Sequence, residues 1–76
     1  MALNPDVFGF RLRVAMNKRS TRLKKFADAI GKSENTVNKW RNGTQVPALD
    51  TVVRIAEELR VSIDFLIGRT DKMEIR

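Results

Sequence analysis

Apolar residues recur along the chain at the three- and four-residue spacing of amphipathic helices, in five separate segments. No stretch alternates between apolar and polar residues over the length of a strand, so the pattern favours an all-α fold. The predicted helices cover residues 5–18, 22–30, 33–42, 48–59 and 62–67. The chain has 76 residues, a length that allows one small domain with one modest core. We therefore expect a compact five-helix bundle.

The predicted helix starts carry suitable capping residues. Residue types that accept hydrogen bonds from a helix N-terminus precede four of the helices, namely Asn4, Ser20 or Thr21, Ser33 and Ser62. Pro5 also suits the first helical position. Gly9, by contrast, lies inside the first helix, where glycine costs about 1 kcal/mol relative to alanine. The pattern along the chain gives no reason for this glycine.

The apolar stripes also predict the core. In the third helix Val37 and Trp40 lie three residues apart, so we expect both to pack against the bundle. The fourth helix is expected to bury Leu49, Val52, Val53, Ile55, Ala56 and Leu59. Gly68 ends the regular pattern after the fifth helix. We assign residues 1–68 to the folded domain and residues 69–76 to a C-terminal tail that is flexible or begins a linker.

The charge of the chain is strongly asymmetric. The net charge is +6, and residues 11–41 contain ten Lys or Arg side chains against two acidic ones. Residues 42–76 contain five basic and six acidic side chains. Because an excess of one sign in one region costs self-repulsion, its presence there favours a polyanionic partner over a merely solvated surface.

The composition argues against several other functions. The chain has no His and no Cys, so the usual general base and the commonest metal ligands are missing. No carboxylate pair and no phosphate-binding glycine loop is indicated, so we expect no enzyme activity, no cofactor and no metal. No apolar run approaches the roughly 20 residues of a membrane span, and no signal-peptide pattern opens the chain. We therefore expect a soluble, cytoplasmic protein without a membrane partner.

The segment GKSENTVNKWRNGTQVP, residues 31–47, gives the charge asymmetry a more specific meaning. Only Gly31 and Lys32 separate the second and third helices, and a tight join containing glycine is typical of a helix-turn-helix unit. If Val37 and Trp40 pin the third helix to the body, its other face carries amides, Lys and Glu. Amide and Lys side chains pair with base edges in the major groove, and basic side chains neutralise phosphates. The polar face thus predicts DNA recognition.

The stretch FADAIGKSENTVNKWRNGTQVPALDTVVRIAEELRVSIDFLIG resembles the phage repressor and Cro-type (XRE-like) helix-turn-helix domain family. FADAIG matches the positioning helix, KSENTVNKW the recognition helix, and NG…P the loop after it. The resemblance covers about residues 8–68. It implies a five-helix bundle that binds a double-stranded, pseudo-palindromic operator as a homodimer. It further implies a transcriptional regulator, most simply a phage-type repressor or its N-terminal domain, acting at the nucleoid of a bacterial or phage-infected cell.

The resemblance also implies roles for individual side chains. The family's base-reading positions fall on Glu34, Asn35, Thr36, Asn38 and Lys39. Its positions near phosphates fall on Ser33, Lys24, Arg41, Asn42 and Thr44, and Arg22 is a further candidate beside Leu23, where the family often has Gln. Many members hold a buried Arg–Glu pair where this chain has Met16 and Arg41. Without that acid, we expect Arg41 to be freer to reach a phosphate.

Two questions remain open at the level of sequence. The last helix is more apolar than its length requires, so Ile63, Phe65 and Ile67 are candidates for a two-fold dimer contact. An alternative to DNA binding is a protein-interaction module, either antitoxin-like or the target of an antirepressor protein. A basic, amide-rich third helix favours DNA over that alternative.

Overall fold

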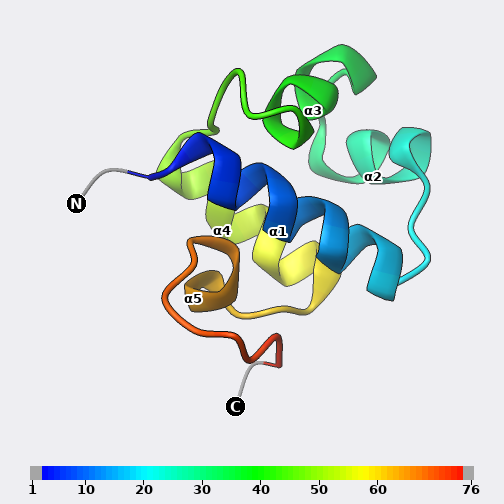
Figure 1. Cartoon of the computed structure of the whole chain (residues 1–76). Helices are drawn as coiled ribbons and strands as arrows, with labels where there is room; N and C mark the ends of the chain where they lie inside the picture. The colour runs from blue at the N-terminus through cyan, green and yellow to red at the C-terminus, as the bar shows by residue number, and fades with distance from the viewer. Residues whose placement is uncertain (1–2, 75–76) are drawn as a thin grey trace.

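The computed structural model describes residues 3–74, which form five helices joined by short turns (Figure 1). The helices are α1 Pro5–Lys18, α2 Leu23–Ile30, α3 Glu34–Arg41, α4 Leu49–Leu59 and α5 Ile63–Leu66. No strand occurs within the described residues, and the predicted all-α five-helix fold is confirmed. Residues 1–2 and 75–76, the outer ends of the predicted domain and tail, lie outside the described part. Within residues 3–74 no helix is both long and apolar enough to cross a bilayer.

Side chains cap three of the helices as predicted. N–H groups of the first turn donate to Asn4 Oδ1 (2.9 and 3.1 Å), Ser33 Oγ (3.0 Å) and Ser62 Oγ (2.9 Å). The prediction for α2 is wrong. Its N-cap residue is Arg22, which makes no side-chain cap hydrogen bond, and Ser20 instead adopts a left-handed backbone (φ 53°) after α1. The start of α2 therefore keeps N–H groups without a side-chain cap.

The core lies around α1, which crosses the middle of the molecule (Figure 1). Helix α1 packs against α3 and α5, α2 packs against α3 and α4, and α4 packs against α5. Val37 and Trp40 are buried as predicted, with Trp40 only 2% exposed. The other buried apolar residues are Phe8, Leu12, Ala15, Met16, Phe26, Ala27, Ile30, Val52, Ile55, Ala56, Leu59, Val61, Phe65 and Leu66.

The predicted core of the fourth helix needs two corrections. Leu49 is 74% exposed, and Val53 is only half-buried. Leu49 is the first residue of α4 and lies three residues before buried Val52, so it continues the apolar stripe. At that end, however, the stripe runs past the edge of the bundle. Val61, which lies between helices and so outside any periodic stripe, is fully buried instead.

The structure explains Gly9. A Cβ atom on this residue would lie 2.6 Å from the carbonyl oxygen of Trp40 and 2.9 Å from that of Arg41. Both oxygens belong to the backbone, which cannot move aside as the tip of a flexible side chain can. Gly9 therefore allows α1 to approach the C-terminal end of α3 more closely than any other residue would.

Three arginines of the α1 region donate to carbonyl groups near the C-terminal ends of three different helices. Arg13 Nη1 donates to the Arg41 carbonyl at the end of α3. Arg19 donates to the carbonyls of Leu59 and Arg60 at the end of α4, both at 2.7 Å. Arg11 Nη1 donates to the Phe65 carbonyl in α5 at 3.3 Å. Terminal carbonyls lack partners within their own helix, and positive charge is favourable there. These cations therefore hold the bundle together.

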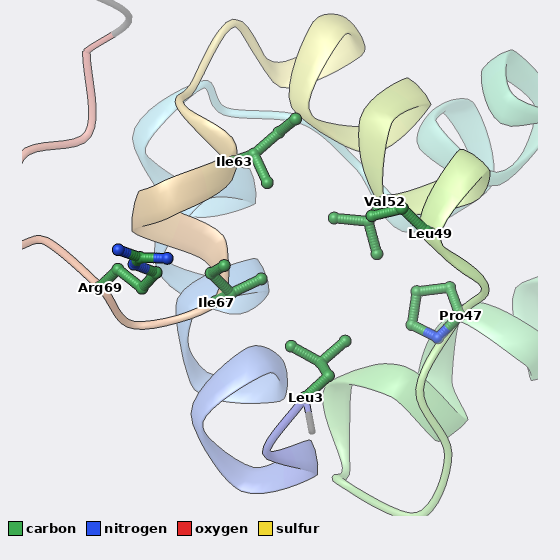
Figure 2. A pocket seen from close by; sticks show the side chains of 7 residues that line it. All are labelled: Leu3, Pro47, Leu49, Val52, Ile63, Ile67 and Arg69. Carbon is green, nitrogen blue, oxygen red and sulfur yellow. The ribbon is translucent and has the colours of Figure 1, made fainter. Parts of the chain in front are cut away.

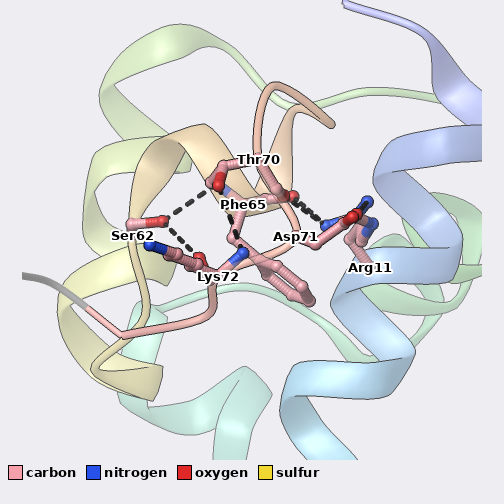
Figure 3. A network of polar contacts seen from close by, with 6 residues as sticks. All are labelled: Arg11, Ser62, Phe65, Thr70, Asp71 and Lys72. Atoms are coloured by element: carbon pink, nitrogen blue, oxygen red, sulfur yellow. Dashed lines mark hydrogen bonds and ion pairs between the residues drawn. The ribbon is translucent and has the colours of Figure 1, made fainter.

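Residues 69–74, which we predicted to form a flexible tail or the start of a linker, make contacts with α1 and the start of α5 (Figure 3). The Arg11 guanidinium, 4.4 Å from the Phe65 ring centre, donates to the Thr70 carbonyl (2.7 Å) and pairs with Asp71 (3.0 Å). The Ser62 N–H donates to the Met73 carbonyl (2.8 Å), and the Met73 side chain packs against the core. The apolar pattern did not predict these contacts, because hydrogen bonds to backbone carbonyls, rather than an apolar stripe, fix the segment to the bundle.

Candidate nucleic-acid interface

The turn between α2 and α3 fixes the relative direction of these helices. Gly31 has φ 72°, a left-handed conformation that glycine adopts without a Cβ penalty. The Gly31 N–H donates to the Asp28 carbonyl (3.2 Å) and the Lys32 N–H to the Ala27 carbonyl (2.9 Å). Ser33 then caps α3 at once. The join is one residue longer than predicted, because Ser33 precedes α3 as its N-cap, and residues 31–33 separate the two helices. This short glycine-containing turn fixes α3 against α2.

Helix α3 has one buried and one polar face. Val37 and Trp40 face the core, while Glu34, Asn35 and Lys39 are exposed. Thr36 and Asn38, the other two predicted base-reading residues, are half-buried. The structure thus brings all five predicted base-reading side chains onto one short helix. Their contacts with bases remain predictions.

The two hydroxyl groups at the start of α3 are engaged with each other. Ser33 Oγ accepts from the Thr36 N–H (3.0 Å) and donates to Thr36 Oγ1 (2.9 Å). Each hydroxyl has a single proton to donate, so the Ser33–Thr36 bond uses the proton of one of the two groups. The structure assigns Ser33 a capping role, and its phosphate contact stays a prediction.

The predicted phosphate contacts lie around the same helix pair. Arg22, Lys24, Asn42 and Thr44 are all exposed. Lys24 forms a 3.4 Å surface pair with Asp28, which is too weak to hold the ammonium group away from a phosphate. Thr44 Oγ1 donates to the Lys39 carbonyl (3.1 Å) and so helps to fix the loop after α3.

Arg41 is less free than we predicted. Its side chain is half-buried, and its Nε atom is buried without a hydrogen-bond partner among the described residues. Its Nη1 atom donates to Asn38 Oδ1 over 3.4 Å. Met16, the residue that we matched to the other member of the family's pair, is buried. Packing nevertheless restrains the guanidinium, so the loss of the acid did not release it.

Exposed basic side chains gather on the helix-turn-helix unit. Arg11, Arg13 and Arg19 donate to backbone carbonyls, as described above. Five of the exposed cations of residues 11–41 lie on α2, α3 or the residues next to them, namely Arg22, Lys24, Lys25, Lys32 and Lys39. From the sequence, Lys25 and Lys32 contributed only to the net charge of the basic region and were not predicted to contact DNA. Their place beside the turn makes them additional candidates for phosphate contact.

The residues predicted to form a dimer contact divide into two groups. Phe65 is only 5% exposed and packs beneath Arg11, so its assignment to a surface is corrected. Ile63 and Ile67 are half-buried and line a hollow of about 420 Å³ (Figure 2). The other residues lining it are Leu3, Pro47, Leu49, Val52 and Arg69. An apolar surface of this kind is suited to association with another molecule.

A glycine-containing turn that presents an outward-facing polar helix defines the helix-turn-helix class of DNA-binding proteins. Comparison with known families gives the same result, since the model of the helix-turn-helix family matches residues 12–66. The chain belongs to this family, in its XRE type, and is a DNA-binding transcriptional regulator.

One similar protein is a phage repressor. The chain is 39% identical over 57 residues to the cryptic phage CTXphi transcriptional repressor RstR of Vibrio cholerae serotype O1. The match covers 75% of this chain and 48% of that repressor, so the chain spans about half the length of its relative.

Solved structures of two other regulators share the fold. The SOS-response repressor LexA of Eubacterium rectale matches with a TM-score of 0.79 and 25% identity, over 84% of this chain and 68% of LexA. The restriction-modification controller protein C.AhdI of Aeromonas hydrophila matches with a TM-score of 0.76 and 20% identity, over 86% of this chain and 98% of C.AhdI. The second likeness concerns the fold alone.

Proposed function

We propose that this chain is a phage-type transcriptional repressor, or the DNA-binding part of one, whose helix α3 enters the major groove of an operator. The observation that carries the proposal is the polar face of α3, where exposed Asn35 and Lys39 flank half-buried Asn38. Val37 and Trp40 anchor the opposite face, so the reading groups stand on a rigid support. Repression then follows from occupation of a promoter.

The chemistry of this face suits base edges. Asn35 suits adenine, through N6 and N7, and Lys39 suits guanine O6 and N7. Glu34 repels phosphates but accepts a hydrogen bond from cytosine N4, so its role is to read a base. Helix α2 lies across the sugar-phosphate backbone of the DNA. A phosphate there faces the side chains of Arg22 and Lys24 and the uncapped N–H groups at the start of α2.

This division of roles predicts two different mutant phenotypes. Asn35→Ala is expected to lower affinity for the preferred duplex by about 1–3 kcal/mol and to relax the preference at one base pair. Lys24→Ala removes a phosphate contact and is expected to lower the affinity for all duplex sequences about equally. Selection from randomised duplexes, followed by titration of the preferred and a scrambled duplex, measures both. Equal effects of the two changes on specific and scrambled DNA would contradict the assignment.

We further propose that two copies bind a pseudo-palindrome with half-sites about 34 Å apart. The apolar hollow of Figure 2 supports this arrangement, because exposed Leu49 lines it together with Ile63 and Ile67. A two-fold contact through one such patch on each copy is self-complementary. Leu49 is 74% exposed in the single chain. A two-fold contact through the hollow would cover this large apolar side chain.

The dimer contact can be tested with a matched pair of variants. Leu49 and Phe10 are the large apolar residues that stand exposed on the described part of the chain, and Phe10 lies on α1, outside the hollow. Leu49→Ser is expected to lower affinity for a duplex with two half-sites about 10-fold and to leave binding to a single half-site unchanged. Phe10→Ser serves as the control. Equal losses on one and two half-sites would argue against this contact.

A further inference from the structure

We infer that Arg41 is a specificity-determining residue that acts by orienting the side-chain amide of Asn38. The inference rests on the proposed function, in which Asn38 reads a base, and adds a second role to a residue predicted only to contact a phosphate. It is carried by the hydrogen bond from Arg41 Nη1 to Asn38 Oδ1, one turn back along α3. That bond is long, at 3.4 Å, so its effect depends on how firmly Arg41 is held.

Arg41 is held at both its backbone and its side chain. Arg13 donates to its carbonyl oxygen, and Gly9 lets α1 press against the same peptide. The Nε atom is buried, which means that neighbouring groups enclose the stem of the side chain. Only the outer end of the guanidinium is left to make polar contacts. The Arg41 side chain is therefore a fixed donor rather than a mobile surface cation.

A fixed donor determines which way the Asn38 amide faces. Arginine donates hydrogen bonds and accepts none, so it selects the oxygen of the amide and rejects the nitrogen. The Asn38 Nδ2 group makes no hydrogen bond to another described residue and keeps both protons for a ligand. Charge on the guanidinium also polarises the amide and strengthens those donors. Asn38 thus presents donors to the groove, and suits acceptors such as guanine O6 or N7 and thymine O4.

The alternative role for Arg41 is a phosphate contact alone. The two roles differ in what removal of the guanidinium does to base preference. A phosphate contact contributes equally to all sequences, whereas loss of an orienting group allows the Asn38 amide to rotate and to accept as readily as it donates. Preference at the base pair read by Asn38 then broadens.

The experiment is a double-mutant cycle on base preference, with duplexes that vary every position of the selected site. Arg41→Met is expected to reduce discrimination about 10-fold at the same base pair that Asn38→Ala affects, within the range of one good base contact. In the Asn38→Ala background, Arg41→Met should cause no further loss at that pair. Arg22→Met, which removes an exposed cation, is the control and should lower all affinities while leaving preference intact.

Two further measurements keep the test independent of folding defects. Arg41→Lys retains the charge but, without the planar guanidinium group, does not hold a donor where Arg41 Nη1 lies, so it should keep affinity for random DNA while discrimination at that pair falls. In the free protein, Arg41→Met should shift the Asn38 side-chain amide signals in ¹⁵N–¹H spectra, and Arg22→Met should not.

The outcomes separate this inference from the proposed function. If Arg41→Met and Arg41→Lys leave base preference unchanged, Arg41 does not orient Asn38, and the inference fails while DNA recognition stands. Failure of the wild-type protein to select any preferred duplex would overturn the proposed function, and the inference with it.

Discussion

Gly9→Ala is expected to lower the free energy of unfolding by about 2 kcal/mol. In a free helix the change would stabilise by about 1 kcal/mol, but here the new Cβ overlaps the backbone oxygens of Trp40 and Arg41 at 2.6 and 2.9 Å. Helices α1 and α3 must then separate, and overpacking of this kind typically costs about 1–3 kcal/mol. Chemical denaturation followed by circular dichroism measures the change.

The same variant should also impair DNA binding, because the displaced end of α3 carries Lys39 and Arg41. Asn17→Ala is the matched control. It lies on an exposed turn of the same helix and should be neutral or slightly stabilising, since Ala favours helix more than Asn. If Gly9→Ala were as stable as Asn17→Ala, the close approach of the two helices would not hold in solution.

Affinity for DNA is expected to fall steeply with salt. With about five phosphate contacts per monomer, the slope of log affinity against log salt concentration should be roughly −4 to −5. Raising the salt from about 50 to 200 mM should then weaken binding of one monomer to a half-site by about 500-fold. Fluorescence anisotropy on a labelled duplex at four salt concentrations gives the slope directly.

Single variants test whether the basic side chains of the helix-turn-helix unit produce this salt dependence. Lys24→Ala should make the slope less steep by about one unit. Lys72→Ala removes another exposed charge, from the C-terminal segment beside α5 (Figure 3), and should leave the slope unchanged. An affinity that did not depend on salt would rule out binding through phosphates.

The helices themselves could be read from the sequence. Periodic apolar residues fixed their number and approximate bounds, and capping side chains marked the starts of α1, α3 and α5 within a residue or two. Both signals are local, because a helix forms its hydrogen bonds and its cap within a few neighbouring residues. The prediction failed at the start of α2, where packing held the helix without a cap.

The candidate site was predictable in part, for a related reason. A polar face opposite Val37 and Trp40 follows from helical geometry alone, so Asn35, Asn38 and Lys39 could be placed on it. Whether those side chains are free to bind cannot follow from spacing. Arg41 looked free in the sequence and is restrained by its surroundings, while Phe65 looked available and lies in the core.

The sequence by itself determined the class of this protein: a small all-α bundle with a polar recognition helix on its basic half. Only the tertiary structure decided what each remaining residue does. Gly9 packs against carbonyl groups that are distant in sequence, and Arg13 and Arg19 donate hydrogen bonds to such groups. Thr70 and Asp71 contact Arg11 of α1, about sixty residues earlier in the chain. Periodicity records which face of a helix is apolar. The partner that a glycine or a cation meets depends on how whole helices are placed, and that information is distributed over the entire chain.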